Sequence, residues 1–218
     1  MSATGRNLPG HTRFVDDEYE TPFWCTELIL PHIQSGPIFD PCCGTGAILH
    51  VAELAGRDTY GMELNESRAS ASNDLRITQC ADALSSDWPK HRHVVTNPPY
   101  SLAMEFIEKS KSINSSFDRA FLLRLNFLGS QKRAAFHKAH PCDIYVLSER
   151  PSFCMAQSCS KKCGWGDMIP LHPDGTPRRV QARTCPKCGS QVRNSSSDSC
   201  EYGWFVFGPG RGNRWFML

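Results

Sequence analysis

The sequence predicts an α/β fold with a doubly wound sheet, and two patterns support that prediction. Short apolar runs typical of buried strands alternate with longer helical patterns through most of the 218 residues. Several acidic or amide side chains also follow the strand-like runs directly. Because ligands in such sheets bind beyond the carboxyl ends of the strands, these side chains are expected to meet at one edge.

The elements follow one another in a β–α alternation. Strands are expected at residues 38–40, 59–62, 77–80, 94–96, 120–125, 144–147 and 204–208. Helices are expected at residues 23–32, 47–55, 66–75, 102–111 and 131–140. The last two strands can pair as a hairpin with a cysteine-rich insert at its tip, which places that insert just before the last strand.

The first strand runs into a glycine-containing turn, residues 40–46 (DPCCGTG), and then into a helix. Asp40, Cys42, Gly44 and Gly46 lie in this turn. The strand–turn–helix shape is typical of nucleotide-binding crossovers, although the complete dinucleotide fingerprint is not there. Glycines at such a turn allow the backbone to approach a ligand closely.

Two further strand ends carry acids. Glu63 ends the second strand, 17 residues after Gly46, where a carboxylate can accept both hydroxyls of a ribose. Asp82 and Ala83 follow the third strand, and Asp82 can accept a hydrogen bond from an adenine amino group. Any one of these acids is ordinary in a solvated loop, whereas the ordered set favours a nucleotide-like ligand.

The fourth strand ends in Asn97, Pro98, Pro99 and Tyr100. Consecutive prolines fix φ and remove two N–H donors, which stiffens the strand end. The Asn97 amide oxygen and the Pro98 carbonyl can then accept both hydrogens of one amino group, and Tyr100 supplies a flat face. Accepting both hydrogens localises a lone pair that adenine otherwise delocalises into its ring. The tetrapeptide therefore predicts chemistry on a planar amino group, and the alternative interpretation is a proline-stiffened loop.

These motifs resemble those of the class I S-adenosylmethionine-dependent methyltransferases, in particular the branch that modifies amino groups of nucleic-acid bases. Residues 19–24 (YETPFW) look like the family's upstream cofactor motif, and residues 40–46 look like its cofactor loop. A narrower resemblance, to small methyltransferases of bacteriophages and prophages, rests on residues 122–128, 148–153 and 201–207.

The resemblance implies a Rossmann-like methyltransferase fold, the cofactor S-adenosyl-L-methionine, and catalysis by residues 97–100. It implies that the chain transfers a methyl group to the exocyclic amino group of adenine in DNA. Tyr100 and Phe153 would face the target base. The implied cofactor-binding residues are Tyr19, Thr21, Pro22, Asp40, Cys42, Gly44, Gly46, Glu63, Asp82, Ala83 and Asn97.

Three other functions stay open at this point. An RNA base or a protein glutamine also offers a planar amino group to the same tetrapeptide. A protein of a different class, a catalytically silent zinc-bearing nucleic-acid binder, is the non-enzymatic alternative.

Residues 154–200 hold six of the 11 cysteines. Two close pairs, Cys159 with Cys163 and Cys185 with Cys188, are separated by 21 residues, and a glycine follows each pair. This spacing predicts a structural zinc site with four thiolate ligands, and the alternative is a reduced cysteine-rich loop. A metal would supply the folding energy that a short insert with few large apolar residues lacks.

The same insert concentrates positive charge. Its seven Lys/Arg and three Asp give +4, so the remainder of the chain is −2 when the whole is +2. Arg178 and Arg179 are expected to contact nucleic-acid phosphates, and the alternative is a solvated basic face.

The length fits one domain with a small insert. We expect a flexible N-terminal arm at 1–18, a methyltransferase domain at 19–153 plus 201–218, and a zinc-ribbon-like insert at 154–200. The sequence shows neither a transmembrane run nor a signal region. A cytoplasmic location without a membrane partner is therefore expected, which for a phage or prophage origin would be the cytoplasm of a bacterial host. The resemblance implies DNA (or RNA) as the partner, and a monomer is expected.

Overall fold

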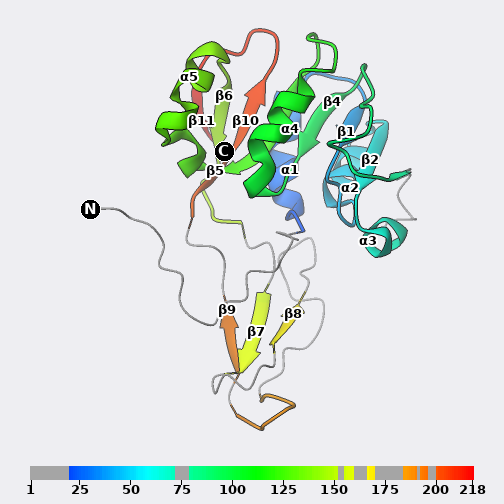
Figure 1. Ribbon diagram of the computed structural model, residues 1–218, viewed down its shortest axis with the longest axis vertical. Helices are drawn as coiled ribbons and strands as arrows, with labels where there is room; N and C mark the ends of the chain where they lie inside the picture. Colours follow the sequence, from blue (N-terminus) through cyan, green and yellow to red (C-terminus); the bar gives the residue numbers. More distant parts are fainter. Residues whose placement is uncertain are drawn as a thin grey trace.

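The centre of the molecule is an eight-stranded mixed sheet (Figure 1). The computed structural model describes residues 20–71, 79–151, 155–159, 166–169, 184–190, 192–195 and 200–218. The strands of this sheet are β1 (Ile38–Asp40), β2 (Thr59–Glu63), β3 (Gln79–Cys80), β4 (His93–Thr96), β5 (Arg119–Arg124), β6 (Asp143–Val146), β10 (Tyr202–Phe207) and β11 (Trp215–Met217). Their order across the sheet is β11-β6-β10-β5-β4-β1-β2-β3.

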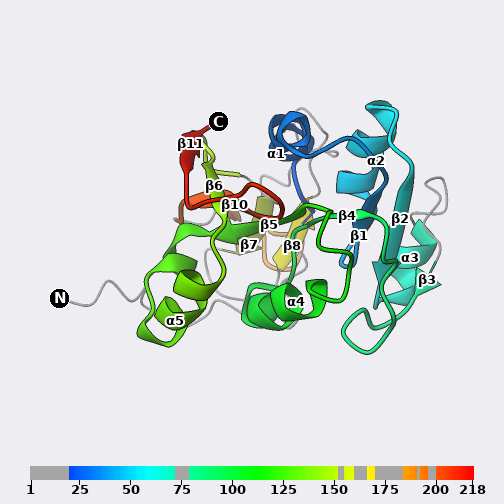
Figure 2. The same ribbon diagram turned by 90° about the horizontal axis from the view of Figure 1, so that it is seen from above.

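Helices cover both faces of the sheet. They are α1 (Phe23–Ile29), continued by the 3₁₀ turn η1 (Leu30–His32), α2 (Ala47–Leu54), α3 (Glu66–Ala71), η2 (Tyr100–Leu102), α4 (Ala103–Ser110), η3 (Leu125–Leu128) and α5 (Gln131–Ala139). Figure 2 shows α1 and α2 on one face and α4 and α5 on the other. Among the described helices, none has the length and apolar character that a membrane crossing requires.

The strand directions confirm the predicted α/β class. Each neighbouring pair from β3 through β2, β1 and β4 to β5 is parallel. Among the described strands of this sheet, β10 alone runs antiparallel to its neighbours, β5 and β6, so the predicted hairpin of the last two expected strands is confirmed. Every predicted strand and helix is present, although the expected residues 72–75 and 77–78 lie outside the described part of the chain.

The chain contains one strand that the sequence did not predict. After β10 it turns back and forms β11, which pairs in parallel with β6, so the cysteine-rich insert precedes the penultimate strand and not the last one. Asp143 holds this return, because its carboxylate accepts hydrogen bonds from the Gly212 and Arg214 backbone and pairs with the Arg214 guanidinium at 2.6 Å. β11 is an edge strand of this sheet, and its Trp215 and Met217 side chains are exposed.

The insert forms a small sheet of its own. Its strands β7 (Met155–Cys159), β8 (Gly166–Ile169) and β9 (Val192–Ser195) pair antiparallel in the order β8-β7-β9. Because β6 runs in the same direction as β5 and β4, the chain leaves the main sheet for the insert at the carboxyl edge of those strands (Figure 1).

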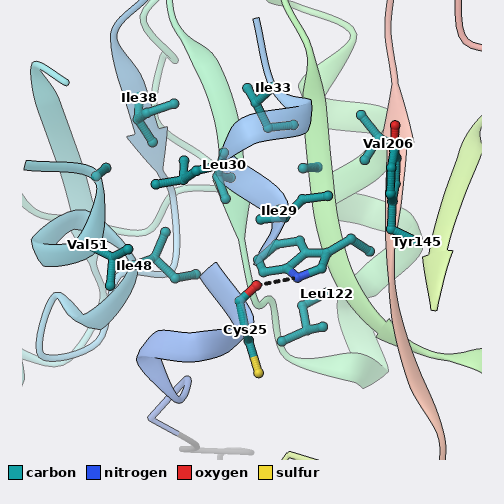
Figure 3. Close-up of a cluster of buried hydrophobic side chains, with 14 of the residues drawn as sticks. Cys25, Ile29, Leu30, Ile33, Ile38, Ile48, Val51, Leu122, Tyr145 and Val206 are labelled. Atoms are coloured by element: carbon teal, nitrogen blue, oxygen red, sulfur yellow. Dashed lines mark hydrogen bonds between the residues drawn. The ribbon is translucent and has the colours of Figure 1, made fainter. Parts of the chain in front are cut away.

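A single tryptophan fastens α1 to the sheet. Trp204 of β10 is fully buried, and its indole Nε1 donates a hydrogen bond to the Cys25 carbonyl of α1 at 2.9 Å, the dashed line in Figure 3. Ile29, Ile48 and Leu122 surround this contact from α1, α2 and β5. The helix that follows the upstream motif is therefore fixed against the middle of the sheet.

Replacing Trp204 with phenylalanine should lower the free energy of unfolding by about 1–3 kcal/mol, because it removes the donor to a buried carbonyl and leaves a void. Urea denaturation measures the change. Trp215→Phe is the matched control, since Trp215 is 60% exposed and its replacement should change the stability by less than about 0.5 kcal/mol. Equal effects of the two substitutions would contradict the role given to the Trp204 hydrogen bond.

Candidate active site at the carboxyl edge of the sheet

The sheet brings the predicted site residues to one edge. β1 ends at Asp40, β2 ends at Glu63, and β4 ends at Thr96, directly before Asn97. These three strands are adjacent and parallel, with Ile38 of β1 paired to the first residues of β2 and β4. The side chains that follow the three strands therefore emerge side by side, as the sequence predicts.

Glu63 locks the glycine turn. Its Oε2 accepts the Gly44 backbone N–H at 2.8 Å, and its Oε1 accepts the Asn65 N–H at 2.8 Å. Gly44 and Gly46 have φ values of +56° and +91°, which side-chain-bearing residues rarely adopt. The carboxylate expected to accept ribose hydroxyls thus also holds the loop, and each oxygen retains a further lone pair for a ligand.

The turn is also pressed tightly onto β2. The Cys43 N–H donates to the Met62 carbonyl at 3.0 Å, and a Cβ added at Gly61 would lie 2.9 Å from the Cys43 sulfur. Burial raises the pKa of the Cys42 and Cys43 thiols, so both stay neutral. A neutral thiol is a poor nucleophile, and these cysteines serve packing rather than covalent catalysis.

Asp40 is a buried carboxyl group at the centre of this edge. It is 1% exposed, and burial raises its pKa from 3.8 to about 7. Hydrogen bonding, including the Cys42 N–H donated to Oδ1 at 3.0 Å, limits the rise, whereas the nearby Glu63 charge adds to it. The group is therefore poised to change protonation near neutral pH.

The side-chain amide of Asn97 is hydrogen-bonded through its nitrogen but not through its oxygen among the described residues. Its Nδ2 donates to the Thr21 hydroxyl at 3.1 Å, and Thr21 is itself buried. Its Oδ1 is buried and accepts no hydrogen bond from the residues that the structure describes. A buried acceptor in this condition costs about 1–3 kcal/mol, so it is expected where a ligand brings the donor.

Tyr100 is held by two residues of the neighbouring strands. The Arg124 guanidinium at the end of β5 lies 4.8 Å from the Tyr100 ring centroid, and its Nε donates to the Tyr202 hydroxyl at 3.1 Å. The rings of Tyr100 and Tyr202 are 5.8 Å apart and tilted by 49°. The ring beside Asn97 is thus fixed in orientation, with a cation against it.

The upstream motif reaches the same place. The Thr45 hydroxyl donates to Glu20 Oε1 at 2.7 Å, which joins the residue before Thr21 to the glycine turn. Pro22 precedes α1 and its carbonyl accepts the Cys25 N–H at 3.1 Å. Tyr19, the first residue of the predicted motif, lies outside the described residues.

Asp82 and Ala83 follow β3 at the outer end of this edge. Asp82 is exposed, and its Oδ1 accepts the Leu84 N–H at 2.9 Å. Ala83 is buried, and its carbonyl accepts the Trp88 indole N–H at 2.7 Å. Asp82 therefore shapes its own turn, and its predicted contact with adenine stays a prediction.

The predicted zinc ligands are only partly described. Cys185 and Cys188 lie on a turn in which the Cys185 backbone carbonyl accepts the Gly189 N–H at 2.8 Å. Gly189 has a φ of +70°. Cys159 ends β7, and no group of three or more potential metal ligands occurs among the described residues. Cys163, Phe153, Arg178 and Arg179 lie outside the described part of the chain.

The structure adds three residues that sequence reasoning missed: Glu20, Arg68 and Arg124. Arg68 of α3 lies against the glycine turn, since a Cβ added at Gly44 would meet its Nη2 at 2.9 Å. Glu20 and Arg124 have the contacts given above. Glu20 lies within the upstream motif at residues 19–24, and Arg124 is a polar residue at the end of an apolar strand, so the sequence holds a signal for these two.

Comparisons with known proteins identify the fold. No protein-family model and no curated protein matches the sequence. A solved structure from Pyrococcus horikoshii, provisionally assigned as an RNA methyltransferase, has a TM-score of 0.53 at 13% identity and covers 88% of this chain and 87% of its own. One from Listeria monocytogenes, provisionally assigned as a class I S-adenosylmethionine-dependent methyltransferase, has a TM-score of 0.50 at 12% identity and covers 90% of this chain and 62% of its own.

The chain has the class I methyltransferase fold. A structure from Agrobacterium tumefaciens, assigned by prediction as an O-methyltransferase, gives a similar result, with a TM-score of 0.50, 14% identity, and coverage of 90% of this chain and 84% of its own. The predicted Rossmann-like fold is therefore confirmed. At these identities the likeness concerns the fold alone, and the reaction must be inferred from the site.

The raised pKa of Asp40 makes stability depend on pH. Because the folded state holds this proton between the ordinary value of 3.8 and about 7, stability should fall as pH rises through that window. Asp40→Asn removes the titration. The free energy of unfolding of the unmodified protein, minus that of the variant, should decline with a slope approaching about 1.4 kcal/mol per pH unit. Urea titrations at a series of pH values measure this slope, and parallel curves for the two proteins would rule out the shift.

Proposed function

We propose that this chain is an S-adenosylmethionine-dependent methyltransferase that acts on the exocyclic amino group of adenine in DNA. The observation that supports it best is Asn97, whose buried Oδ1 has no donor among the described residues while its Nδ2 is fixed by Thr21. An amino group of a planar base brings the missing donor.

The roles of the chain's own groups follow from this arrangement. Asn97 Oδ1 accepts one amino hydrogen and the Pro98 carbonyl accepts the other, which concentrates the lone pair on the nitrogen. The Thr21 hydroxyl accepts from Asn97 Nδ2 at 3.1 Å and keeps the amide from rotating away. Tyr100, steadied by Arg124 and Tyr202, supports the ring of the base by stacking, worth about 1–3 kcal/mol per base.

The described residues fit the proposed cofactor. Two glycines with positive φ let the backbone of the turn approach it, Glu63 has lone pairs to spare for its ribose, and the buried Asp40 offers a carboxyl group to its amino-acid end. When bound, the cofactor supplies a methyl group attached to a positively charged sulfur, and the neutral thioether that remains is a good leaving group. The protein's task is then mainly to hold the amino nitrogen in line with that methyl group.

DNA is the proposed substrate because the chain resembles phage and prophage adenine methyltransferases and carries a basic insert. RNA is the second candidate, since the similar structure from Pyrococcus horikoshii is provisionally assigned as an RNA methyltransferase. The chain leaves the main sheet after β6 at the edge that carries Asn97 and returns to it at β10, and Arg178 and Arg179 lie between these two strands in the sequence. We propose that this segment holds nucleic-acid phosphates.

We also propose that Cys159, Cys163, Cys185 and Cys188 bind one structural zinc ion. The turn at 185–189, with Gly189 in the left-handed region, presents two cysteines in the compact form that suits one half of a tetrahedral thiolate site. The three short strands of the insert gain a cross-link from such a metal.

A labelled-methyl transfer assay with unmethylated DNA, RNA and protein tests the proposed function. DNA should acquire N6-methyladenine, detected by nucleoside mass spectrometry. Asn97→Ala should lower turnover by about 100-fold or more, as losses of preorganised hydrogen-bonding groups do, while cofactor binding persists. Asn114→Ala is the control, because Asn114 is exposed and serves only a local turn.

Each other outcome of this assay indicates a different substrate or function. Transfer to RNA alone would replace DNA as substrate, and transfer to a protein glutamine would exclude both nucleic acids. Near-normal turnover of Asn97→Ala would contradict the proposed chemistry. Nucleic-acid binding without transfer to any substrate would identify a silent binder.

Metal analysis tests the zinc site. The purified chain should contain about one zinc ion per molecule. The double substitution Cys185→Ser with Cys188→Ser should abolish it, because it removes half of the thiolates. Cys80→Ser is the control, since Cys80 is exposed on β3 of the main sheet. A chain purified without zinc, or a double variant that retains it, would exclude the proposed site.

A further inference from the structure

A pocket of about 220 Å³ lies at the amino edge of the sheet, opposite to the methyl-transfer site. Its walls come from the last turns of α4 and α5, the first residue of β5 and the end of β10. Ile107 and Phe207 give it an apolar wall. Its ionisable lining residues are all basic: Lys111, Arg119, His140 and Arg211.

One of these cations has no counter-charge of its own. Lys111 pairs with Glu108 at 2.6 Å, and Arg211 pairs with the buried Asp118 at 3.0 Å. Arg211 also lies 3.7 Å from Asp143, a carboxylate that pairs more closely with Arg214, at 2.6 Å. The Asp118 oxygens are further occupied by the Gln34 N–H at 2.9 Å. Among the described residues, Arg119 is thus the lining guanidinium without an ion pair.

The side chain of Arg119 also contains a buried donor without a partner in the part of the chain that the structure describes. Its Nε is buried without an acceptor among the described residues, and burial lowers the pKa of its guanidinium while Asp118 raises it. An unpaired guanidinium of this kind calls for an anion with several acceptor oxygens.

We propose that this pocket binds a phosphate group through Arg119, with Lys111 as a supporting donor. The Lys111 ammonium also lies 3.1 Å from His140 Nε2, which accepts from it. The planar guanidinium offers parallel N–H donors that match two phosphate oxygens, and its charge remains at every physiological pH. The apolar wall of Ile107 and Phe207 suits the organic part of a phosphate ester. The phosphate can belong to a small molecule or to a nucleic-acid backbone. The site shares no residue with the methyl-transfer edge and does not depend on the function proposed there.

Calorimetric titration of the full chain with inorganic phosphate, pyrophosphate and a short DNA duplex tests the site. Arg119→Met keeps the length of the side chain without its charge and should weaken binding of the phosphate-bearing ligand at least tenfold. Lys138→Met is the control, because Lys138 is exposed on α5 and does not line the pocket. Arg119→Lys keeps the charge without the paired donors and should weaken binding by an intermediate factor, which keeps the test valid if Arg119→Met misfolds.

The two sources of phosphate are separated by the ligand affected. A small-molecule site gives phosphate or pyrophosphate affinity that falls in Arg119→Met, while DNA affinity stays unchanged. A backbone site gives the tenfold loss for the duplex. The proposal is overturned if the unmodified chain binds none of the three ligands, or if Arg119→Met and Lys138→Met bind all of them equally.

Discussion

The parallel pairing of β1 with β2 and β4 is the constraint on which the site depends. Ile38 is in register with the first residue of each neighbour, so the three strands start at the same level and end within two residues of one another. That alignment alone brings Asp40, Glu63 and Asn97, which are distant in the sequence, to one edge. Buried parallel strands tolerate little slippage, because a shift of one residue would turn every side chain to the opposite face.

Within this frame, the polar groups of the edge are used in two different ways. Each Glu63 oxygen accepts one backbone N–H, and the carboxylate thereby holds the glycine turn in place. Asn97 is satisfied on one side only, through Thr21, and keeps its oxygen unpaired. A fully bonded edge would be a structural feature, whereas one fixed and half-bonded amide is what a site for an amino group requires.

The two ends of β5 carry arginines with contrasting surroundings. Arg124, at the carboxyl end, lies against the Tyr100 ring and donates a hydrogen bond to the Tyr202 hydroxyl. Its guanidinium therefore contacts residues of the proposed site. Arg119, at the amino end, lines a pocket without a partner among the described residues. One strand thereby links the proposed methyl-transfer edge to a separate basic pocket, and both rest on the same buried core.

Much of the fold was determined by local sequence. Apolar runs bounded by turns defined each expected strand and helix, and the glycine turn and the proline-stiffened end at Asn97 defined the edge, because backbone preferences and hydrophobic periodicity act over a few residues. Tertiary structure alone decided the rest. The hydrogen bonds of Asp143 hold the returning chain where β11 forms. Segments far away in the sequence provide the surroundings of four charged residues: Glu20, Arg68, Arg119 and Arg124. Whether a charged side chain is paired, stacked or unmatched depends on neighbours that only folding assembles.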